Sequence, residues 1–280
     1  MEIVEHIEAI RTLRPRFERL GLVPTMGYLH EGHLSLIRRA RADCGAVAVS
    51  IFVNPTQFAP HEDLARYPRD LDHDLRLLRQ EQVDLVFVPH NSIIYPPDFC
   101  TYVHVEQLTT MLEGRARPGF FRGVATVVCK LFNIIQPTHA YFGQKDAQQC
   151  VVVQQMVKDL NLPIQIIIGP TVREPDGLAM SSRNAYLSPT ERTAATTLYR
   201  ALQSAKELYV AGERNAESLR QSIQRVLAAE PLAQPEYISA ADPTTLDELE
   251  TIDERGVLLS LAVRIGPARL IDNILLPNKP

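Results

Sequence analysis

The stretch Pro24-Thr25-Met26-Gly27-Tyr28-Leu29-His30-Glu31-Gly32-His33 decides the fold expected for this chain. It sets two glycines and two imidazoles between an expected strand over residues 20–24 and an expected helix over residues 32–42. In open parallel sheets, ligands bind where a strand ends and the next helix begins, and backbone N–H groups at a helix start favour phosphate. The stretch therefore predicts a parallel α/β fold with an anion site at this junction.

The same alternation of β-rich and helical segments continues to residue 170. Further strands are expected at residues 46–53, 83–88, 139–142 and 164–168, and crossover helices at residues 70–80, 123–135 and 146–160. Continuous apolar runs such as residues 46–53 are typical of strands that are buried on both faces. The pattern predicts βαβ units in a doubly wound parallel sheet.

The alternation of strand-like and helical segments ends after Arg173. Ser188-Pro189-Thr190-Glu191 combines an N-cap serine, a proline at the first helical position and a glutamate at the third, which predicts a helix start. We expect one long helix over residues 188–210, a second over residues 215–229, and strands at residues 237–239, 257–263 and near Leu270. Helices followed by strands indicate a smaller α+β domain, so the predicted domains are residues 1–172 and 173–280.

Composition places the 280-residue chain among ordinary globular proteins. With 45% hydrophobic and 22% charged residues, it fits neither a disordered chain nor a membrane protein. The formal net charge of −4 argues against a nucleic-acid surface, which needs a surplus of basic residues. Residues Met1 to His6 lack the basic and apolar regions of a signal peptide. We therefore expect no membrane partner, no nucleic-acid partner and a cytoplasmic location.

The cysteines and histidines do not show a metal-binding pattern. Cys44, Cys100, Cys129 and Cys150 are scattered without a C-x-x-C pair, and we expect reduced, mostly buried thiols of a cytosolic protein. The His-Glu-Gly-His segment looks like a shortened H-E-x-x-H zinc motif, but its histidines stand at i and i+3 and no third ligand is evident nearby. The sequence therefore predicts no dedicated protein ligands for a metal.

Three more segments carry side chains that suit a nucleotide or a polar substrate. Gly143-Gln144-Lys145-Asp146 follows an expected strand and offers a lysine to a phosphate, although such a pair is also typical of a solvated helix cap. Met180-Ser181-Ser182-Arg183 offers hydroxyl and guanidinium donors for a triphosphate, although a plain polar turn is the favoured explanation of this segment taken alone. The amides of Asn54 and Gln57 suit an uncharged, polyhydroxylated substrate, and an Asn-Pro turn alone would not explain Gln57. Their positions at strand ends and at the domain boundary predict a common cleft.

Ordered blocks from Leu22 to Asn273 extend this pattern: Pro-Thr-Met-Gly-Tyr-Leu-His-Glu-Gly-His, Ser-Ile-Phe-Val-Asn-Pro-Thr-Gln-Phe, Arg-Tyr-Pro-Arg-Asp, Met-Leu-Glu-Gly, Phe-Arg-Gly-Val-Ala-Thr-Val, Tyr-Phe-Gly-Gln-Lys-Asp and Met-Ser-Ser-Arg-Asn-Ala-Tyr-Leu. Together they resemble the family of pantothenate synthetases, or pantoate-beta-alanine ligases. This family belongs to the nucleotidyltransferase superfamily with an H-x-G-H motif. The resemblance implies a Rossmann-like, doubly wound parallel sheet of the nucleotidyltransferase type, followed by a smaller α+β C-terminal lid domain.

The resemblance also implies an activity, the ATP-dependent condensation of D-pantoate with beta-alanine to pantothenate, a step toward coenzyme A. In the family, the pantoate carboxylate attacks the α-phosphorus of ATP to give pantoyl adenylate and pyrophosphate. The beta-alanine amine then displaces AMP. Because the substrate is itself the nucleophile, no activated serine or cysteine is required. Mg²⁺ is expected with ATP, and a homodimer is implied.

Matched by motif, the resemblance implies catalytic roles for His33, His30 and Lys145. It implies ATP contacts for Met26, Gly27, Tyr28, Leu29, His30, Glu31, Gly32, His33, Gly143, Gln144, Lys145, Asp146, Val172, Met180, Ser181, Ser182 and Arg183. Gln57 matches a position that binds pantoate and beta-alanine, and Gln149 and Asn54 match positions at pantoate. Many relatives carry Gly-Glu-Lys-Asp where this chain has Gln144, so any role that needs a carboxylate there is not expected.

Two other functions stay open on the residues alone. A nucleic-acid-binding relative of a tRNA synthetase would share the H-x-G-H element, but neither half of this chain is basic. A nucleotidyltransferase acting on another small molecule would share it too, although such enzymes usually lack the long C-terminal domain and the Asn54 and Gln57 amides.

Overall fold

The computed structural model describes residues 1–60 and 62–277. These residues form two compact units. Met1–Gln144 and Gln149–Pro170 make up the first unit, and Lys145–Gln148 packs with the residues from Thr171 onward in the second. The chain therefore leaves the first unit for four residues, 145 to 148, and returns to it. The predicted domain boundary after residue 172 did not include this exchange and stays a prediction.

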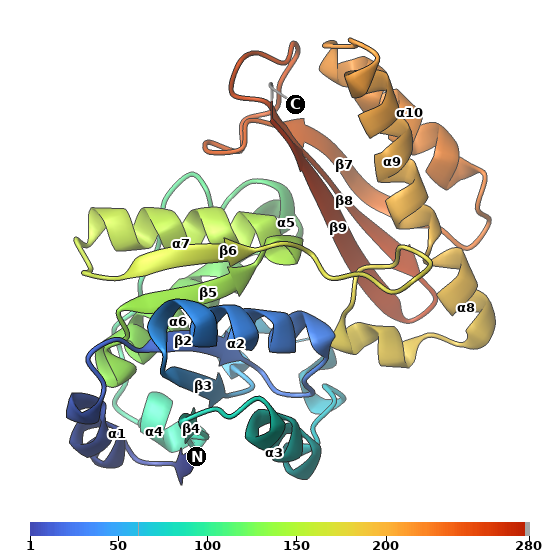
Figure 1. Ribbon diagram of the computed structural model, residues 1–280. Helices are drawn as coiled ribbons and strands as arrows, with labels where there is room; N and C mark the ends of the chain where they lie inside the picture. Colours follow the sequence, from blue (N-terminus) through green and yellow to red (C-terminus); the bar gives the residue numbers. More distant parts are fainter. Residues whose placement is uncertain (61, 278–280) are drawn as a thin grey trace. The chain divides into compact units, whose positions relative to one another are not determined.

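The first unit is built on a parallel sheet, which has six strands over the residues described (Figure 1). The strands are β1 (Glu2–Val4), β2 (Gly21–Thr25), β3 (Val47–Ile51), β4 (Leu85–Phe87), β5 (His139–Gly143) and β6 (Gln165–Gly169). They lie in the order β1-β4-β3-β2-β5-β6, and each pairing is parallel. After β2 the chain continues to β3, toward the β1 edge of the sheet, whereas after β5 it continues to β6, at the opposite edge. This confirms the predicted doubly wound sheet.

Helices cover the sheet of the first unit (Figure 1). They are α1 (Ile7–Leu13), α2 (Glu31–Cys44), α3 (Leu71–Gln80), α4 (Asn91–Ile94), α5 (Leu112–Ala116), α6 (Phe120–Ile135) and α7 (Ala147–Asp159). Val23 and Val49 belong to a buried cluster with α2 and α3, whereas their strand neighbours Leu22 and Ala48 are equally buried and point to the opposite face. The central strands are thus buried on both faces, as their continuous apolar runs predicted.

The first edge of the sheet was missed by the sequence analysis, which began the fold at residue 20. β1 pairs with β4 through Glu2, Ile3 and Val4, and α1 follows it. The strand has only three residues, and its burial pattern is exposed, exposed and half-buried. Because an edge strand of this kind carries no continuous apolar run, the periodicity that identifies the central strands is absent from it.

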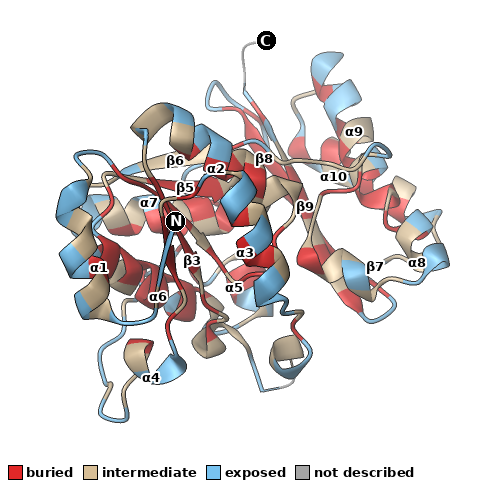
Figure 2. Cartoon of the chain, turned by 60° about the horizontal axis from the view of Figure 1, so that its bottom comes forward, coloured by how far each residue is buried: buried red, intermediate tan, exposed pale blue. Residues whose placement is uncertain are grey.

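Helix α6 is the most deeply buried crossover of the first unit (Figure 2). Its apolar residues 124–135 would suit either a subunit interface or a buried crossover helix. Within the single chain, Val124, Ala125, Val128, Leu131 and Ile135 are all at most 4% exposed. The intrachain packing therefore accounts for them.

The second unit combines three helices with an antiparallel sheet within the described residues (Figure 1). Its elements are α8 (Pro189–Ala194), α9 (Thr197–Val210), α10 (Ala216–Ala228), β7 (Gln234–Ala241), β8 (Val257–Ile265) and β9 (Ala268–Leu276). The strand order is β7-β8-β9. Alternate residues of β8, Val257, Leu259, Leu261 and Val263, join α9 and α10 in one buried cluster. This is the predicted small α+β arrangement.

The expected helix over residues 188–210 is interrupted, so that prediction was wrong as a single element. Its start is confirmed, because Ser188 and Glu191 form a reciprocal capping box. The helix breaks between α8 and α9, where the Thr193 hydroxyl donates to the Pro189 carbonyl and the Thr196 hydroxyl donates to the Thr193 carbonyl. Threonine side chains that bond to nearby carbonyls compete with helix continuation.

The cysteines differ from the sequence expectation in their burial. All four are free, but only Cys150 is buried, Cys44 and Cys129 are half-buried, and Cys100 is exposed. The prediction of mostly buried thiols was wrong, because Cys100 lies in an irregular segment after α4 rather than on an apolar face of a helix or strand. No described helix is both long and apolar enough to cross a membrane.

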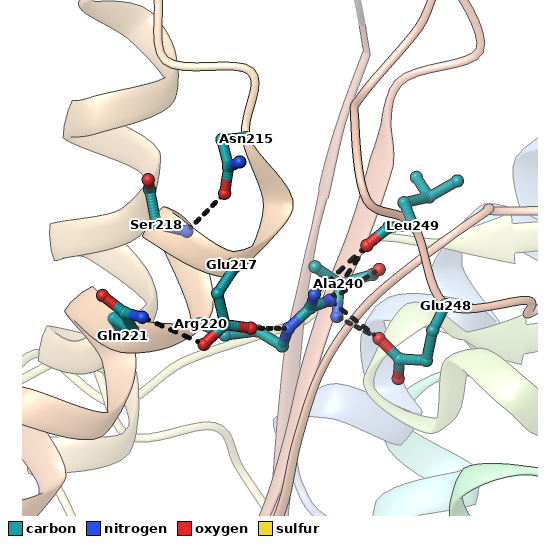
Figure 3. A network of polar contacts seen from close by, with 8 residues as sticks. All are labelled: Asn215, Glu217, Ser218, Arg220, Gln221, Ala240, Glu248 and Leu249. Atoms are coloured by element: carbon teal, nitrogen blue, oxygen red, sulfur yellow. Dashed lines mark hydrogen bonds and ion pairs between the residues drawn. The ribbon is translucent and has the colours of Figure 1, made fainter.

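Arg220 of α10 joins three parts of the second unit (Figure 3). Its guanidinium donates to the carboxylates of Glu217 and Glu248, at 2.9 Å each, and to the backbone carbonyl of Leu249 at 3.2 Å. The same Glu248 carboxylate accepts from the Ala240 N–H of β7. A single charged side chain thus ties the helix to the strand and to the loop that follows it.

We predict that Arg220→Ala lowers the free energy of unfolding of the second unit by about 1–3 kcal/mol, because two carboxylates and a carbonyl lose a charged donor. Chemical denaturation followed by circular dichroism measures the change. The matched control is Arg200→Ala, which removes an exposed arginine from α9 and should change stability by less than about 0.5 kcal/mol. Equal stability of the two variants would contradict the prediction.

Candidate functional site

The predicted junction loop lies at the topological switch point of the first unit. Residues 26–30 connect β2 to α2, and Gly143 ends the neighbouring strand β5. Because the crossovers after β2 and β5 run in opposite directions, the carboxyl ends of these two strands flank the point where open α/β sheets bind ligands. The sequence analysis predicted both segments at strand ends, and the structure confirms that placement.

His30 and His33 together form the cap at the start of α2. The Nδ1 atom of His30 accepts from the Gly32 N–H at 3.2 Å, and the Nδ1 atom of His33 accepts from the His30 N–H at 3.3 Å. Their ring centroids lie 4.1 Å apart. A neutral imidazole whose Nδ1 accepts carries its proton on Nε2, so each ring has an N–H donor on the side away from its cap. Such donors beside the positive end of a helix dipole suit an oxyanion.

Asp74 is a residue of this loop that sequence reasoning missed. Its carboxylate accepts from the Tyr28 N–H at 2.8 Å and from the Leu29 N–H at 2.7 Å. Asp74 is only 1% exposed. Burial raises the pKa of the Asp74 carboxyl, although the two N–H donors act in the opposite direction. The available signal was its position four residues before Leu78, which puts a carboxylate on the apolar face of α3.

The loop needs this support because its backbone is unusual. Gly27 and Tyr28 both have positive φ angles, 82° and 54°. A Cβ atom on Gly27 would lie 3.0 Å from the Asp74 carboxylate, so glycine allows the close approach as well as the angle. Tyrosine pays a conformational cost in this region, which the paired hydrogen bonds offset.

Gln57 and Asn54 lie at the end of β3, and the structure brings Gln57 to the junction loop. The Gln57 amide donates to the Met26 sulfur at 3.0 Å. Asn54 is 1% exposed, and its amide donates to Gln57 Oε1 at 3.0 Å and to the Gly123 carbonyl at 3.1 Å. Its oxygen accepts from Thr56 and Tyr95. Asn54 therefore orients Gln57 through a buried network.

Close packing keeps this turn in place. A Cβ atom on Gly123 of α6 would lie 2.4 Å from the Thr56 carbonyl oxygen, so the helix can approach the turn only at a glycine. From the other side, the Arg117 guanidinium donates to the Gln57 carbonyl at 3.2 Å and pairs with the Glu62 carboxylate at 2.6 Å. Sequence reasoning also missed Arg117, because nothing local to its segment relates it to Gln57.

The remaining predicted residues are distributed over both units. Gln144, Lys145 and Asp146 form a short 3-10 helix, with the Lys145 ammonium 3.5 Å from the Asp146 carboxylate. Gln149 lies half-buried in the first turn of α7. In the second unit, the Val172 carbonyl accepts from the Met180 N–H at 3.0 Å, which joins two residues that the sequence analysis named separately.

The serine-bearing segment is more ordered than a plain turn. Ser181 is the N-cap of a 3-10 helix over Ser182–Tyr186, and its hydroxyl accepts from the Arg183 N–H at 3.3 Å. The Asn184 amide donates to the Ala179 carbonyl. The segment therefore has a defined backbone shape. A turn of this kind can also carry phosphate donors, so the two interpretations are compatible.

A doubly wound sheet with a glycine- and histidine-bearing loop at its switch point defines the class of nucleotide-binding α/β proteins. Within that class, the family model described as pantoate-beta-alanine ligase matches residues 2–275. The chain belongs to the pantoate-beta-alanine ligase family.

Curated relatives and solved structures agree with this assignment. A pantothenate synthetase of Chloroflexus aggregans is 64% identical, covering 99% of this chain and 100% of the relative. The crystal structure of pantothenate synthetase from Thermus thermophilus has a TM-score of 0.95 at 47% identity and covers 98% of this chain and 99% of its own. The ligase of Francisella tularensis, complexed with beta-gamma ATP and beta-alanine, has a TM-score of 0.80 at 36% identity over 98% and 97% of the two chains.

We predict that Asp74→Asn disturbs the junction loop, because an NH₂ group cannot accept from a backbone N–H. One buried donor is left unpaired, at a cost of about 1–3 kcal/mol. The free energy of unfolding should fall by that amount, and the KM for ATP should rise by roughly 2- to 12-fold if half of it is lost from the bound state. Denaturation and steady-state kinetics measure the two effects.

The control for this variant is Asp72→Asn, an exposed carboxylate in the same turn of α3. Both changes remove one negative charge from the helix start, so only the contact with the loop distinguishes them. If the two variants have the same stability and the same KM for ATP, Asp74 does not support the loop.

Proposed function

We propose that this chain catalyses the ATP-dependent condensation of D-pantoate with beta-alanine to pantothenate. In the first step, a carboxylate oxygen of pantoate attacks the α-phosphorus of ATP, and the bond to pyrophosphate breaks. In the second, the beta-alanine amine attacks the acyl carbon of pantoyl adenylate, loses a proton and displaces AMP. The match of residues 2–275 to the ligase family carries this proposal.

The paired imidazoles of α2 supply the first contribution to catalysis. His30 and His33 use Nδ1 to cap the helix, so each neutral ring carries its N–H on Nε2, and we assign these donors to the phosphates of ATP. Negative charge shifts from the α-phosphate to the departing pyrophosphate during adenylation, so fixed donors stabilise the transition state. We assign His33 as the catalytic donor and His30 as its companion on the phosphates. The substrate carboxylate acts as the nucleophile without an activated side chain.

Further ATP contacts are assigned on the family resemblance. The residues assigned to them are Met26, Gly27, Tyr28, Leu29, Glu31, Gly32, Gly143, Gln144, Lys145, Asp146, Val172, Met180, Ser181, Ser182 and Arg183. Lys145 is assigned a catalytic role because its ammonium can stabilise the negative charge that develops on the leaving pyrophosphate. Gln144 is neutral and takes the part of a hydrogen-bonding residue only.

Pantoate is assigned to the amides at the end of β3 and the start of α7. Gln57 is held by Asn54 and Arg117, and its amide lies against Met26 of the loop that we assign to ATP. An amide both donates and accepts, which suits the hydroxyl groups of pantoate. Gln149 is the second pantoate residue, Asn54 supports the site, and Gln57 also lies toward beta-alanine.

The proposed Mg²⁺ ion enters with ATP, whose phosphates bind it. Among the residues that the structure describes, no cluster of three or more metal-binding side chains is present. We propose that ATP binds as its Mg²⁺ complex, with the ion held mainly by phosphate and water oxygens, which it prefers.

We also propose a cytoplasmic homodimer. Four free cysteines fit a reducing compartment, and the family resemblance supports the dimer. Light scattering after size-exclusion chromatography at several concentrations measures the mass directly.

The reaction is tested by ATP–pyrophosphate exchange with beta-alanine omitted, which isolates the first step. We predict exchange that depends on D-pantoate, and AMP as the product once beta-alanine is added. Exchange that proceeds equally without pantoate, or release of ADP, would contradict the proposed function. Retention on tRNA at low salt would instead favour the nucleic-acid alternative.

The assigned residues are tested in the same assay. His33→Ala and Lys145→Ala should each lower the exchange rate by about 100- to 1000-fold, because each removes a phosphate donor from the transition state. His90→Ala and Lys158→Ala, which remove exposed residues of the same types, serve as controls. Near-normal exchange in both site variants would remove these residues from the mechanism.

A further inference from the structure

Strand β9 carries two adjacent polar residues that are buried and that stand between Ile271 and Ile274. Asp272 is 2% exposed and Asn273 is 4% exposed. Successive side chains of a strand point to opposite faces. Leu270 and Leu276 belong to the buried cluster with α9 and α10, so Asp272 lies on that helix-covered face and Asn273 lies on the other. Neither residue is among those assigned to ATP or to pantoate.

Asp272 holds the segment that leads into the serine-bearing loop. Its two carboxylate oxygens accept from the Arg173 guanidinium at 2.6 and 2.9 Å, a bidentate pair. The same guanidinium donates to the Gly177 carbonyl and lies 4.0 Å from the ring centre of Tyr199. Arg173 is thereby fixed to the strand, and it directly follows Val172, which pairs with Met180.

Asn273 holds the segment that carries the catalytic lysine. Its side-chain amide donates to the Lys145 carbonyl at 2.8 Å, across 128 residues of sequence. Its own backbone N–H donates to the Asp272 carboxylate at 2.8 Å, which links the two polar contacts. Lys145, Asp272 and Asn273 all belong to the second unit.

The charges around this pair are consistent with the contacts. Burial raises the pKa of the Asp272 carboxyl, and the positive charges of Arg173 and Lys145 oppose that rise. A buried carboxylate of this kind requires its partners, since removing one leaves an uncompensated charge.

We propose that Asp272 and Asn273 are positioning residues of the ATP site, which set Lys145 and the 172–183 segment in one fixed geometry from the two faces of β9. The proposal rests on the proposed function, because it acts through residues assigned there to ATP. The C-terminal sheet accordingly positions Lys145 through the hydrogen bond from Asn273 to the lysine's backbone carbonyl. A loose lysine would still carry its charge, but it would meet the leaving pyrophosphate in the wrong position.

The test measures pantoate-dependent ATP–pyrophosphate exchange for Asn273→Ala and for Asn273→Asp, which preserves the shape but loses the donor. Misplacing a group at the reacting centre costs on the order of 10- to 100-fold in rate. We expect a fall in kcat of this size in both variants, with the KM for pantoate unchanged. Should Asn273→Ala melt below the assay temperature, Asn273→Asp alone decides.

A double-mutant cycle separates positioning from general stability. In a Lys145→Ala background, Asn273→Ala should lower kcat by less than roughly threefold, because the group that it positions is already gone. The matched control is Asn215→Ala, which removes a different asparagine hydrogen bond of the second unit, the one to the Ser218 N–H at the start of α10 (Figure 3). It should lower the melting temperature by a similar amount and leave kcat unchanged.

The outcomes distinguish this proposal from the proposed function. If the unaltered chain shows pantoate-dependent exchange but Asn273→Asp is as fast, the positioning role is overturned and the function stands. An equal loss in the Lys145→Ala background, or an equal loss in Asn215→Ala, also overturns it. Exchange that is independent of pantoate in the unaltered chain overturns the function itself.

Discussion

The pair of hydrogen bonds from the Tyr28 and Leu29 N–H groups to the Asp74 carboxylate is the contact on which the switch-point loop depends. β2 has to end, turn through two residues with positive φ and begin α2. A backbone of that shape is not favoured by its own sequence. The carboxylate on α3 makes it the stable arrangement, and the two histidines then complete the start of α2 by capping it themselves.

How far the sequence predicts this molecule follows from the range of the interactions involved. The central strands and the capping box at Ser188 were predictable, because continuous apolar runs and N-cap chemistry are local signals. The loop after β2 was located for the same reason. The role of Asp74 was not, since its partners lie 45 and 46 residues away. The break between α8 and α9 was missed although its cause is local, because helix periodicity continues through it and a threonine that bonds to a carbonyl three or four residues away also occurs in unbroken helices.

The supports of the candidate site share one chemical form. Asp74 binds two backbone N–H groups, Arg117 binds the Gln57 carbonyl, and Asn273 binds the Lys145 carbonyl. In each case a side chain remote in sequence fixes the main chain of an assigned residue and leaves that residue's own side chain to the substrate. A hydrogen bond to a backbone atom does not depend on the side chain of the residue that it fixes. The local motif therefore gives no signal of such a contact. This is why the motifs predicted where the site lies but not what holds it.

The excursion of Lys145–Gln148 into the second unit affects how the protein can be divided. A gene split after residue 170 would yield a first fragment that encodes the lysine and a second fragment that encodes its amide partner. Neither fragment would contain a properly seated ammonium, although each would hold most of a compact fold. The contact that seats Lys145 therefore needs the β5–α7 link and the last strand in one folded protein.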